Sequence, residues 1–143
     1  MTPREISEQL ERLISEEDPA ASSAELVAQW SSANVGIEAT EPILRFMEEH
    51  PSIELGMPGA LVHFAEKFYG RGYEEKLIES ISRRPTRHTV WMLNRVINGA
   101  KAPATKQRCL DAMVRAKSHP LVETNALNQI NRLLERLGLY GVQ

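Results

Sequence analysis

The sequence predicts an all-α protein, and three observations support this prediction. Apolar residues recur every three or four positions along most of the chain, as they do on one face of an α-helix. Proline, or a capping serine or threonine, precedes most of these apolar rows, as is usual at helix starts. No convincing segment alternates apolar and polar residues as a strand does. Because 143 residues can bury a sizeable core, we expect one helical domain over residues 1–143.

The first two helices are predicted from capping boxes, in which a serine or threonine precedes a glutamate by three positions. Thr2 and Glu5 form the first box, and Ser22 and Glu25 form the second, whose helix ends near Gly36. The apolar side chains expected inside are Ile6, Leu10, Leu13 and Ile14 in the first helix and Leu26, Val27, Trp30 and Ala33 in the second.

The third and fourth helices are bounded by proline and glycine. Thr40 is predicted to cap a short helix that must end before Pro51, because proline disfavours a helical conformation in the residue before it. Pro58 is predicted to open the next helix, which ends at Gly70. The apolar side chains expected inside are Ile43, Leu44, Met47, Leu61, Val62, Phe64, Ala65 and Phe68.

The fifth and sixth helices meet at Pro85. The fifth is predicted from the spacing of Tyr73, Leu77, Ile78 and Ile81. Thr86 is predicted to start the sixth helix, which ends at Gly99 and has so few polar positions that we expect it to be the most buried. Its apolar residues are Val90, Trp91, Met92, Leu93, Val96 and Ile97.

The last two helices are predicted to begin at Pro103 and Pro120, and the second of them ends before Gly138. The apolar rows are Cys109, Leu110, Met113 and Ala116 in the seventh helix and Leu127, Ile130, Leu134 and Leu137 in the eighth.

The spacing of the helix starts predicts the topology. From Pro42 to Pro120 these starts are 14 to 17 residues apart. Connections of about two to six residues make neighbouring helices antiparallel. Consecutive pairs then recur every ~30 residues, within the range of stacked helical hairpins such as HEAT or armadillo repeats. We therefore expect about eight antiparallel helices in an α-solenoid-like array, with a plain helical bundle as the alternative.

The formal charge of −2 conceals an uneven distribution. Residues 1–55 carry twelve acidic and three basic side chains (net −9), whereas residues 56–143 carry seven acidic and fourteen basic ones (net +7). Such polarity suits a charged partner, although surface helices can be charged without one. No apolar run approaches the ~18 residues of a membrane span, and the acidic start does not fit a signal peptide. With one cysteine, we expect a cytoplasmic protein.

The sequence lacks the spacing patterns of common catalytic and metal sites. No two of the four histidines have metal-ligand spacing on one helix face, and Cys109 lies in an apolar stripe, as a core residue does. We therefore expect a protein that is not an enzyme and that holds no metal or cofactor. The carboxylates clustered between residues 38 and 54 suit a docking surface for a basic protein instead.

One polar row on the sixth helix has two interpretations. Arg87, Trp91, Asn94 and Asn98 follow a spacing that places them on one helix face. A tryptophan beside arginine and asparagine could anchor an interface. Alternatively, Trp91 fills the core and the polar groups tie neighbouring helices together.

Three segments of the chain share a pattern: residues 56–64 (GMPGALVHF), 68–70 (FYG) and 85–95 (PTRHTVWMLNR). This pattern is similar to that of bacterial immunity proteins of polymorphic toxin systems, including the partners of contact-dependent growth inhibition toxins, over roughly residues 40–118. The resemblance implies a small cytosolic HEAT-like protein without catalytic activity. Such a protein binds the toxic C-terminal domain of a delivered protein and blocks its active site or substrate access.

The acidic density and the resemblance together predict the partner surface. A nuclease toxin has a basic active-site surface because it holds a polyanion, so the acidic half is its electrostatic counterpart. The predicted partner-binding residues are Glu38, Glu41, Glu48, Glu49 and Glu54, with Arg87, Trp91 and Asn94 added if the sixth helix is exposed. The alternative is a helical-repeat nucleic-acid-binding protein that uses the basic half, although the acidic half and the absence of a base-reading motif disfavour it.

Overall fold

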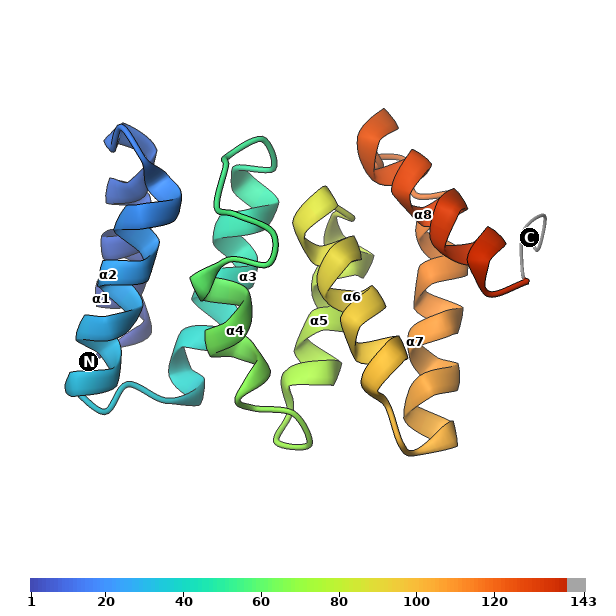
Figure 1. The fold of residues 1–143 in the computed structure, drawn as a ribbon, viewed down its shortest axis with the longest axis horizontal. Helices are drawn as coiled ribbons and strands as arrows, with labels where there is room; N and C mark the ends of the chain where they lie inside the picture. The colour runs from blue at the N-terminus through green and yellow to red at the C-terminus, as the bar shows by residue number, and fades with distance from the viewer. Residues whose placement is uncertain (139–143) are drawn as a thin grey trace. The chain divides into compact units, whose positions relative to one another are not determined.

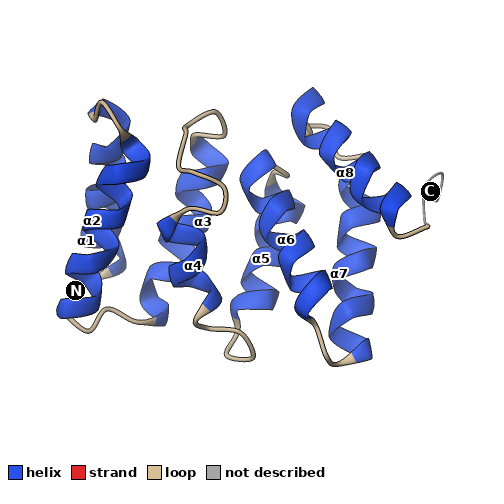
Figure 2. Cartoon of the chain, viewed as in Figure 1, coloured by secondary structure: helices blue, strands red, loops and turns tan. Residues whose placement is uncertain are grey.

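A computed structural model describes residues 1–138 of the chain. These residues form eight α-helices, two short 3-10 helices and no strand (Figure 1, Figure 2). The all-α prediction is therefore confirmed. The elements in order are α1 (Pro3–Glu11), η1 (Arg12–Ser15), α2 (Pro19–Ser32), η2 (Ile37–Ala39), α3 (Thr40–Glu49), α4 (Ala60–Glu66), α5 (Tyr73–Arg83), α6 (Arg87–Gly99), α7 (Pro103–Ala116) and α8 (Thr124–Arg136).

The chain divides into two compact units, an N-terminal unit (residues 1–73) and a C-terminal unit (residues 74–143, described to residue 138). In the N-terminal unit α1 packs on α3 and α2 packs on α4, so one helical pair stacks on the next (Figure 1). In the C-terminal unit α6 packs on both α7 and α8. Stacked helical hairpins, as predicted from the helix spacing, are thus present within each unit. The single domain over residues 1–143 stays a prediction.

The start of α1 is as predicted, but the end of its apolar row is not. Thr2 and Glu5 form the capping box: the Glu5 N–H donates to the Thr2 hydroxyl at 3.2 Å, and the Thr2 N–H donates to the Glu5 carboxylate at 3.3 Å. The α-helix ends at Glu11 and continues as a 3-10 turn, which rotates successive side chains further than an α-helix does. Leu13 is therefore buried, whereas Ile14 is 49% exposed and does not belong to the core.

The start predicted for α2 is wrong by four residues. Asp18, not Ser22, caps the helix, because its carboxylate accepts a hydrogen bond from the Ala21 N–H at 3.1 Å and Pro19 supplies the first helical position. Ser23 lies inside the helix, fully buried, and its hydroxyl donates to the Ala20 carbonyl at 2.8 Å.

The starts of α3 and α4 are each displaced slightly from the predicted residue. Thr40 is the first residue of α3 rather than its cap, since η2 leads directly into the helix. Pro58 precedes α4, whose N-cap is Gly59. A Cβ atom on Gly59 would overlap the backbone carbonyl oxygen of the buried Leu55, so this close approach requires glycine.

An aromatic cluster forms much of the core of the N-terminal unit. Trp30 is fully buried and meets Phe64 edge-on, with ring centroids 5.3 Å apart. Phe64 meets Phe68 in the same way at 5.7 Å. The Trp30 indole Nε1–H donates to the Gln9 side-chain oxygen at 2.7 Å. These contacts connect α1, α2 and α4 through one residue.

Helix α3 has seven buried residues of ten. Helix α6, which we expected to be the most buried helix, has eight of thirteen. It begins after Thr86, which exchanges hydrogen bonds with Thr89: the backbone N–H of each donates to the hydroxyl of the other, at 3.0 and 3.1 Å. The side chains buried on α6 are His88, Thr89, Val90, Met92, Leu93, Asn94, Val96 and Ile97. Among the described residues, no helix is both long and apolar enough to cross a membrane.

The start of α7 at Pro103 is confirmed, but that of α8 at Pro120 is wrong. Residues 117–123 form a loop in which His119 Nε2 donates to the Ser82 carbonyl at 2.8 Å and Nδ1 accepts from the Leu121 N–H at 3.0 Å. Pro120 therefore sits in a turn, and α8 begins at Thr124. On α7, Cys109 is fully buried, and this burial raises the pKa of its thiol to about 11.

Candidate interaction surface

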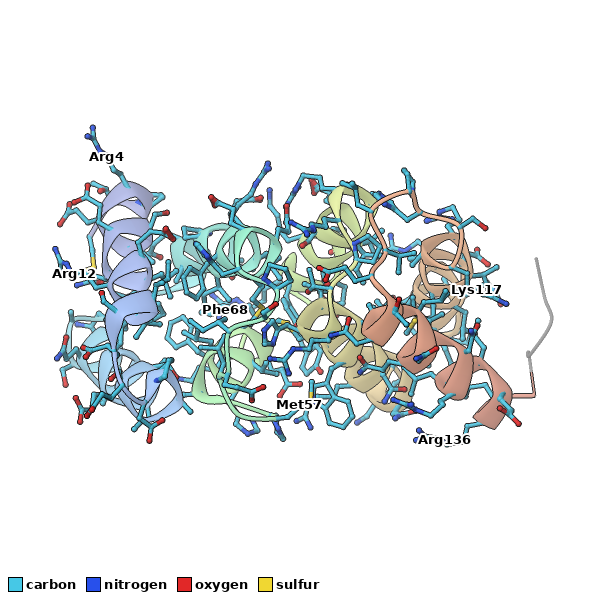
Figure 3. The ribbon with its side chains drawn as sticks, turned by 90° about the horizontal axis from the view of Figure 1, so that it is seen from above. Arg4, Arg12, Met57, Phe68, Lys117 and Arg136 are labelled. Carbon is cyan, nitrogen blue, oxygen red and sulfur yellow. The ribbon has the colours of Figure 1, made fainter. Side chains whose placement is uncertain are left out.

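The division of charge nearly coincides with the division into units. The N-terminal unit has thirteen acidic and five basic side chains (net −8), and residues 74–143 have six acidic and twelve basic ones (net +6). Two of the five cations, Arg4 and Arg12, point outward from α1 and η1 (Figure 3). Lys67 and Arg71 lie over the Phe64 and Phe68 rings, at 4.9 and 5.5 Å from the centroids. The five cations of the N-terminal unit therefore offset only a minority of its thirteen carboxylates.

The predicted acidic residues on α3 differ in exposure. Glu41 and Glu48 are seven residues apart and so lie on one side of the helix, whereas the adjacent Glu49 is rotated away from Glu48. Glu41 forms an ion pair with Arg45 at 3.1 Å. Glu48 is buried, with only 8% of its surface exposed. Glu49 is exposed, and Glu41 is half-buried, so Glu49 is the most accessible of the three.

The five predicted carboxylates do not form one cluster. Glu38 lies in η2, before α3, where its carboxylate accepts a hydrogen bond from the Gly36 N–H at 3.0 Å. Backbone N–H groups of Glu38 itself and of Gly36 lower the pKa of this carboxyl. Glu49 ends α3 and Glu54 follows it, exposed, in the next loop. Because α3 has ten residues, its two ends are about 15 Å apart.

The polar row on α6 is only partly accessible. Asn94 is buried, with 6% of its surface exposed, and Arg87 and Trp91 are half-buried. The Trp91 Nε1–H is buried and has no hydrogen-bond partner among the described residues. Asn94 therefore fits the core interpretation of this row, and Asn98 at the end of the helix is its exposed member.

An open hollow lies beside Glu49. It has a volume of about 460 Å³ and is lined by Ile14, Glu49, His50, Pro51, Ser52 and Ile53. Ile14 comes from η1, and the other residues come from the end of α3 and the loop after it. The apolar spacing placed Ile14 in the core, so sequence reasoning missed this hollow. One signal in the sequence could have indicated the exposure of Ile14. The acidic run and proline of residues 16–19 end the first helical segment just after Ile14 and Ser15.

The two sides of the hollow are joined by His50. Its Nε2 lies 2.8 and 3.1 Å from the two carboxylate oxygens of Glu11, the last residue of α1. Its ring also packs against Phe46, with centroids 5.1 Å apart. The His50 N–H donates to the Phe46 carbonyl at 2.9 Å, and the Ile53 N–H donates to the His50 carbonyl at 3.2 Å. These contacts fix the loop after α3 relative to α1 and η1.

A second hollow, of about 250 Å³, lies between α5 and α7 in the C-terminal unit and is lined by Glu75, Ile78, Glu79, Arg108, Asp111 and Arg115. Arg108 pairs with Glu75 at 2.8 Å, and this hydrogen bond lowers the pKa of Glu75. Acidic and basic groups alternate here, so the positive excess of this unit does not form an uninterrupted row on α7. Among the described residues, no group of three or more His, Cys, Asp or Glu is arranged to hold a metal ion.

Replacing Arg108 with glutamine should destabilise the C-terminal unit at pH 7, and progressively less as the pH falls below 4.5. The folded pKa of Glu75 lies below its ordinary value of 4.5, so the stabilisation is present above pH 4.5 and is lost as the pH falls through the folded value. Thermal unfolding from pH 7 to 3 measures the difference, which should shrink in ~1 M salt. The control is Arg115→Gln, at a residue that lines the same hollow, and it should show no such pH dependence. A destabilisation by Arg108→Gln that does not shrink as the pH falls below 4.5 would contradict the prediction.

Comparisons with protein-family models, with curated proteins and with solved structures find no match for this chain.

Proposed function

We propose that this protein is an immunity protein, which binds the toxic C-terminal domain of a cognate delivered toxin and masks its active site or substrate access. The observation that carries the proposal is the net charge of −8 in the N-terminal unit, together with the exposed carboxylates of Glu49 and Glu54. The sequence pattern over residues 56–95 supports the same class of protein, and a contact-dependent growth inhibition system is the setting that this pattern suggests.

The expected partner is a basic protein domain, such as a nuclease. A nuclease must hold a polyanionic substrate, so its active-site surface carries an excess of Lys and Arg. An acidic protein surface competes for those cations and accelerates the encounter by electrostatic steering. Inhibition of this kind requires no catalytic group on the immunity protein, and the bound complex acts stoichiometrically in the cytoplasm.

A co-expression experiment tests the proposal. The C-terminal domain encoded by the reading frame immediately upstream should arrest growth when it is expressed alone. Co-expression of this chain should restore growth, and the two proteins should co-purify in fixed stoichiometry. A neighbouring product that is toxic but is neither bound nor neutralised would contradict the proposal.

Charge reversal in the N-terminal unit should slow association with that toxin. Glu16, Glu17 and Glu49 are exposed, so the triple change to lysine alters charge while leaving the core intact. We expect the association rate constant to fall about tenfold or more at low salt, and its salt dependence to weaken, because steering is lost. Stopped-flow or surface plasmon resonance measures both.

The matched control is the triple lysine variant of Glu79, Asp111 and Glu135, which makes the same charge change in the C-terminal unit, at exposed positions. It should not slow association with a basic toxin. Equal effects of the two triple variants would show that only total charge matters and would contradict an N-terminal partner surface.

The alternative function, nucleic-acid binding, is favoured by one observation, the net +6 charge of residues 74–143. The alternation of Glu75, Arg108, Asp111 and Arg115 around one hollow argues against a continuous phosphate-binding row. Fluorescence anisotropy with duplex and single-stranded DNA and RNA tests it. Salt-sensitive binding at micromolar protein would favour the alternative over the immunity function.

A further inference from the structure

We propose that the hollow between η1 and the loop after α3 accepts one apolar side chain from a basic segment of a partner protein. The nature of the partner, a basic protein, rests on the proposed function. The new element is the anchor: Ile14 and Ile53 bind an aliphatic or aromatic side chain, and carboxylates around them bind the Lys or Arg residues on either side of it.

Ile14, which the apolar spacing assigns to the core, is instead exposed and lines the hollow. Ile14 is 49% exposed, and Ile53 is half-buried beside it in a hollow of about 460 Å³. Binding pockets commonly have volumes of about 300–1,000 Å³ and combine apolar walls with a few polar groups. An open hollow of this size can take the end of one large side chain from a protein loop or helix.

The charge around the hollow selects the kind of segment that enters it. Glu49 is part of the lining, and the exposed residues Glu16, Glu17 and Asp18 come two to four positions after Ile14 in the chain. Arg12, two residues before Ile14, is the one cation of η1, so carboxylates outnumber cations along this segment. An acidic segment would therefore meet an excess of like charge, whereas a segment with Lys or Arg on each side of its apolar residue would place cations against these carboxylates. The complementary occupant is therefore apolar at its centre and basic at its flanks.

The hollow is also held in shape before a partner arrives. The contacts of His50 with Glu11 at 2.8 Å and with the Phe46 ring fix one side of it. The hydrogen bond from the Ile53 N–H to the His50 carbonyl closes the loop that carries Ile53. A site that is already formed loses less conformational entropy on binding than one that must be ordered.

Three fluorescein-labelled heptapeptides test the proposal on the full chain. The first is Lys-Arg-Lys-Leu-Lys-Arg-Lys, the second has serine in place of leucine, and the third is Glu-Asp-Glu-Leu-Glu-Asp-Glu. We expect the first peptide to bind about tenfold more tightly than the second, since burial of one leucine side chain supplies a difference of that order. The acidic peptide should not bind.

The substitution Ile14→Ser should remove the preference for leucine over serine at the peptide centre. Ile37→Ser is the matched control, because Ile37 is the same residue type in the same unit, is 43% exposed and does not line the hollow. It should keep the preference. Thermal unfolding of both variants verifies that each is folded.

Several results would overturn the anchor. These are equal binding of the leucine and serine peptides, binding of the acidic peptide, no binding of either basic peptide at millimolar concentration, and equal effects of Ile14→Ser and Ile37→Ser. Self-association that Ile14→Ser abolishes would also overturn it, since a second copy of the chain would then occupy the hollow. The proposed function fails separately, if the peptides discriminate as expected but the neighbouring toxin is not neutralised.

Discussion

Replacing Trp30 with alanine is expected to lower the free energy of unfolding of the N-terminal unit by about 3–5 kcal/mol. The side chain is fully buried, meets Phe64 edge-on and donates its indole N–H to Gln9 at 2.7 Å. Its loss would leave a cavity where α1, α2 and α4 meet. Urea denaturation followed by circular dichroism measures the total effect, and hydrogen exchange localises it to residues 1–73.

A comparison of the two tryptophans separates the hydrogen bond from the packing. Trp30→Phe keeps an aromatic ring but leaves the Gln9 oxygen without its donor, which should cost about 1–3 kcal/mol. Trp91→Phe removes an indole N–H that has no partner among the described residues, so no hydrogen bond is lost there. Equal destabilisation by the two changes would contradict this account of Trp30.

Gly59→Ala should also destabilise the N-terminal unit, by about 1–3 kcal/mol. The backbone conformation of Gly59, with φ of −98°, is accessible to alanine, so the cost is steric. The new Cβ atom would overlap the Leu55 carbonyl oxygen, and relief requires movement of a loop whose Leu55 side chain is buried. Thermal unfolding and hydrogen exchange of residues 55–66 measure the effect.

Gly99→Ala is the control for this substitution. Gly99 is the last residue of α6, and a Cβ atom there would point into open space, with nothing beyond its own helix backbone and chain neighbours within 4 Å. Because alanine favours a helix more than glycine does, this variant should be as stable as the parent or slightly more stable. A Gly59→Ala variant as stable as Gly99→Ala would show that the loop adjusts freely.

Three helix starts were predicted correctly, each from one clear local signal. Thr2 and Thr86 cap their helices, and Pro103 opens α7, as the sequence indicates. Two helix starts were predicted wrongly. Asp18 with Pro19 prevailed over the Ser22 box, whose cap lies four residues later, and Pro120 lies in a turn rather than in the first turn of α8.

The candidate surface was only partly predictable, because it depends on tertiary contacts. Charge counting correctly places a strongly acidic segment in the N-terminal unit, and Glu49 and Glu54 are exposed there. The burial of Glu48 cannot be read from its charge. The exposure of Ile14 results from the change of α1 into η1 and from the packing of the loop after α3, neither of which apolar spacing records.

The environment of Cys109 makes the reaction rate of its thiol a measure of how often the C-terminal unit opens. With a thiol pKa of about 11, roughly one Cys109 side chain in ten thousand is a thiolate at pH 7, and the folded unit shields it from reagents. Alkylation must then wait for α7 to separate from its neighbours. The rate of Cys109 alkylation thus reports how often this part of the native protein opens. The measurement needs no label and no engineered residue.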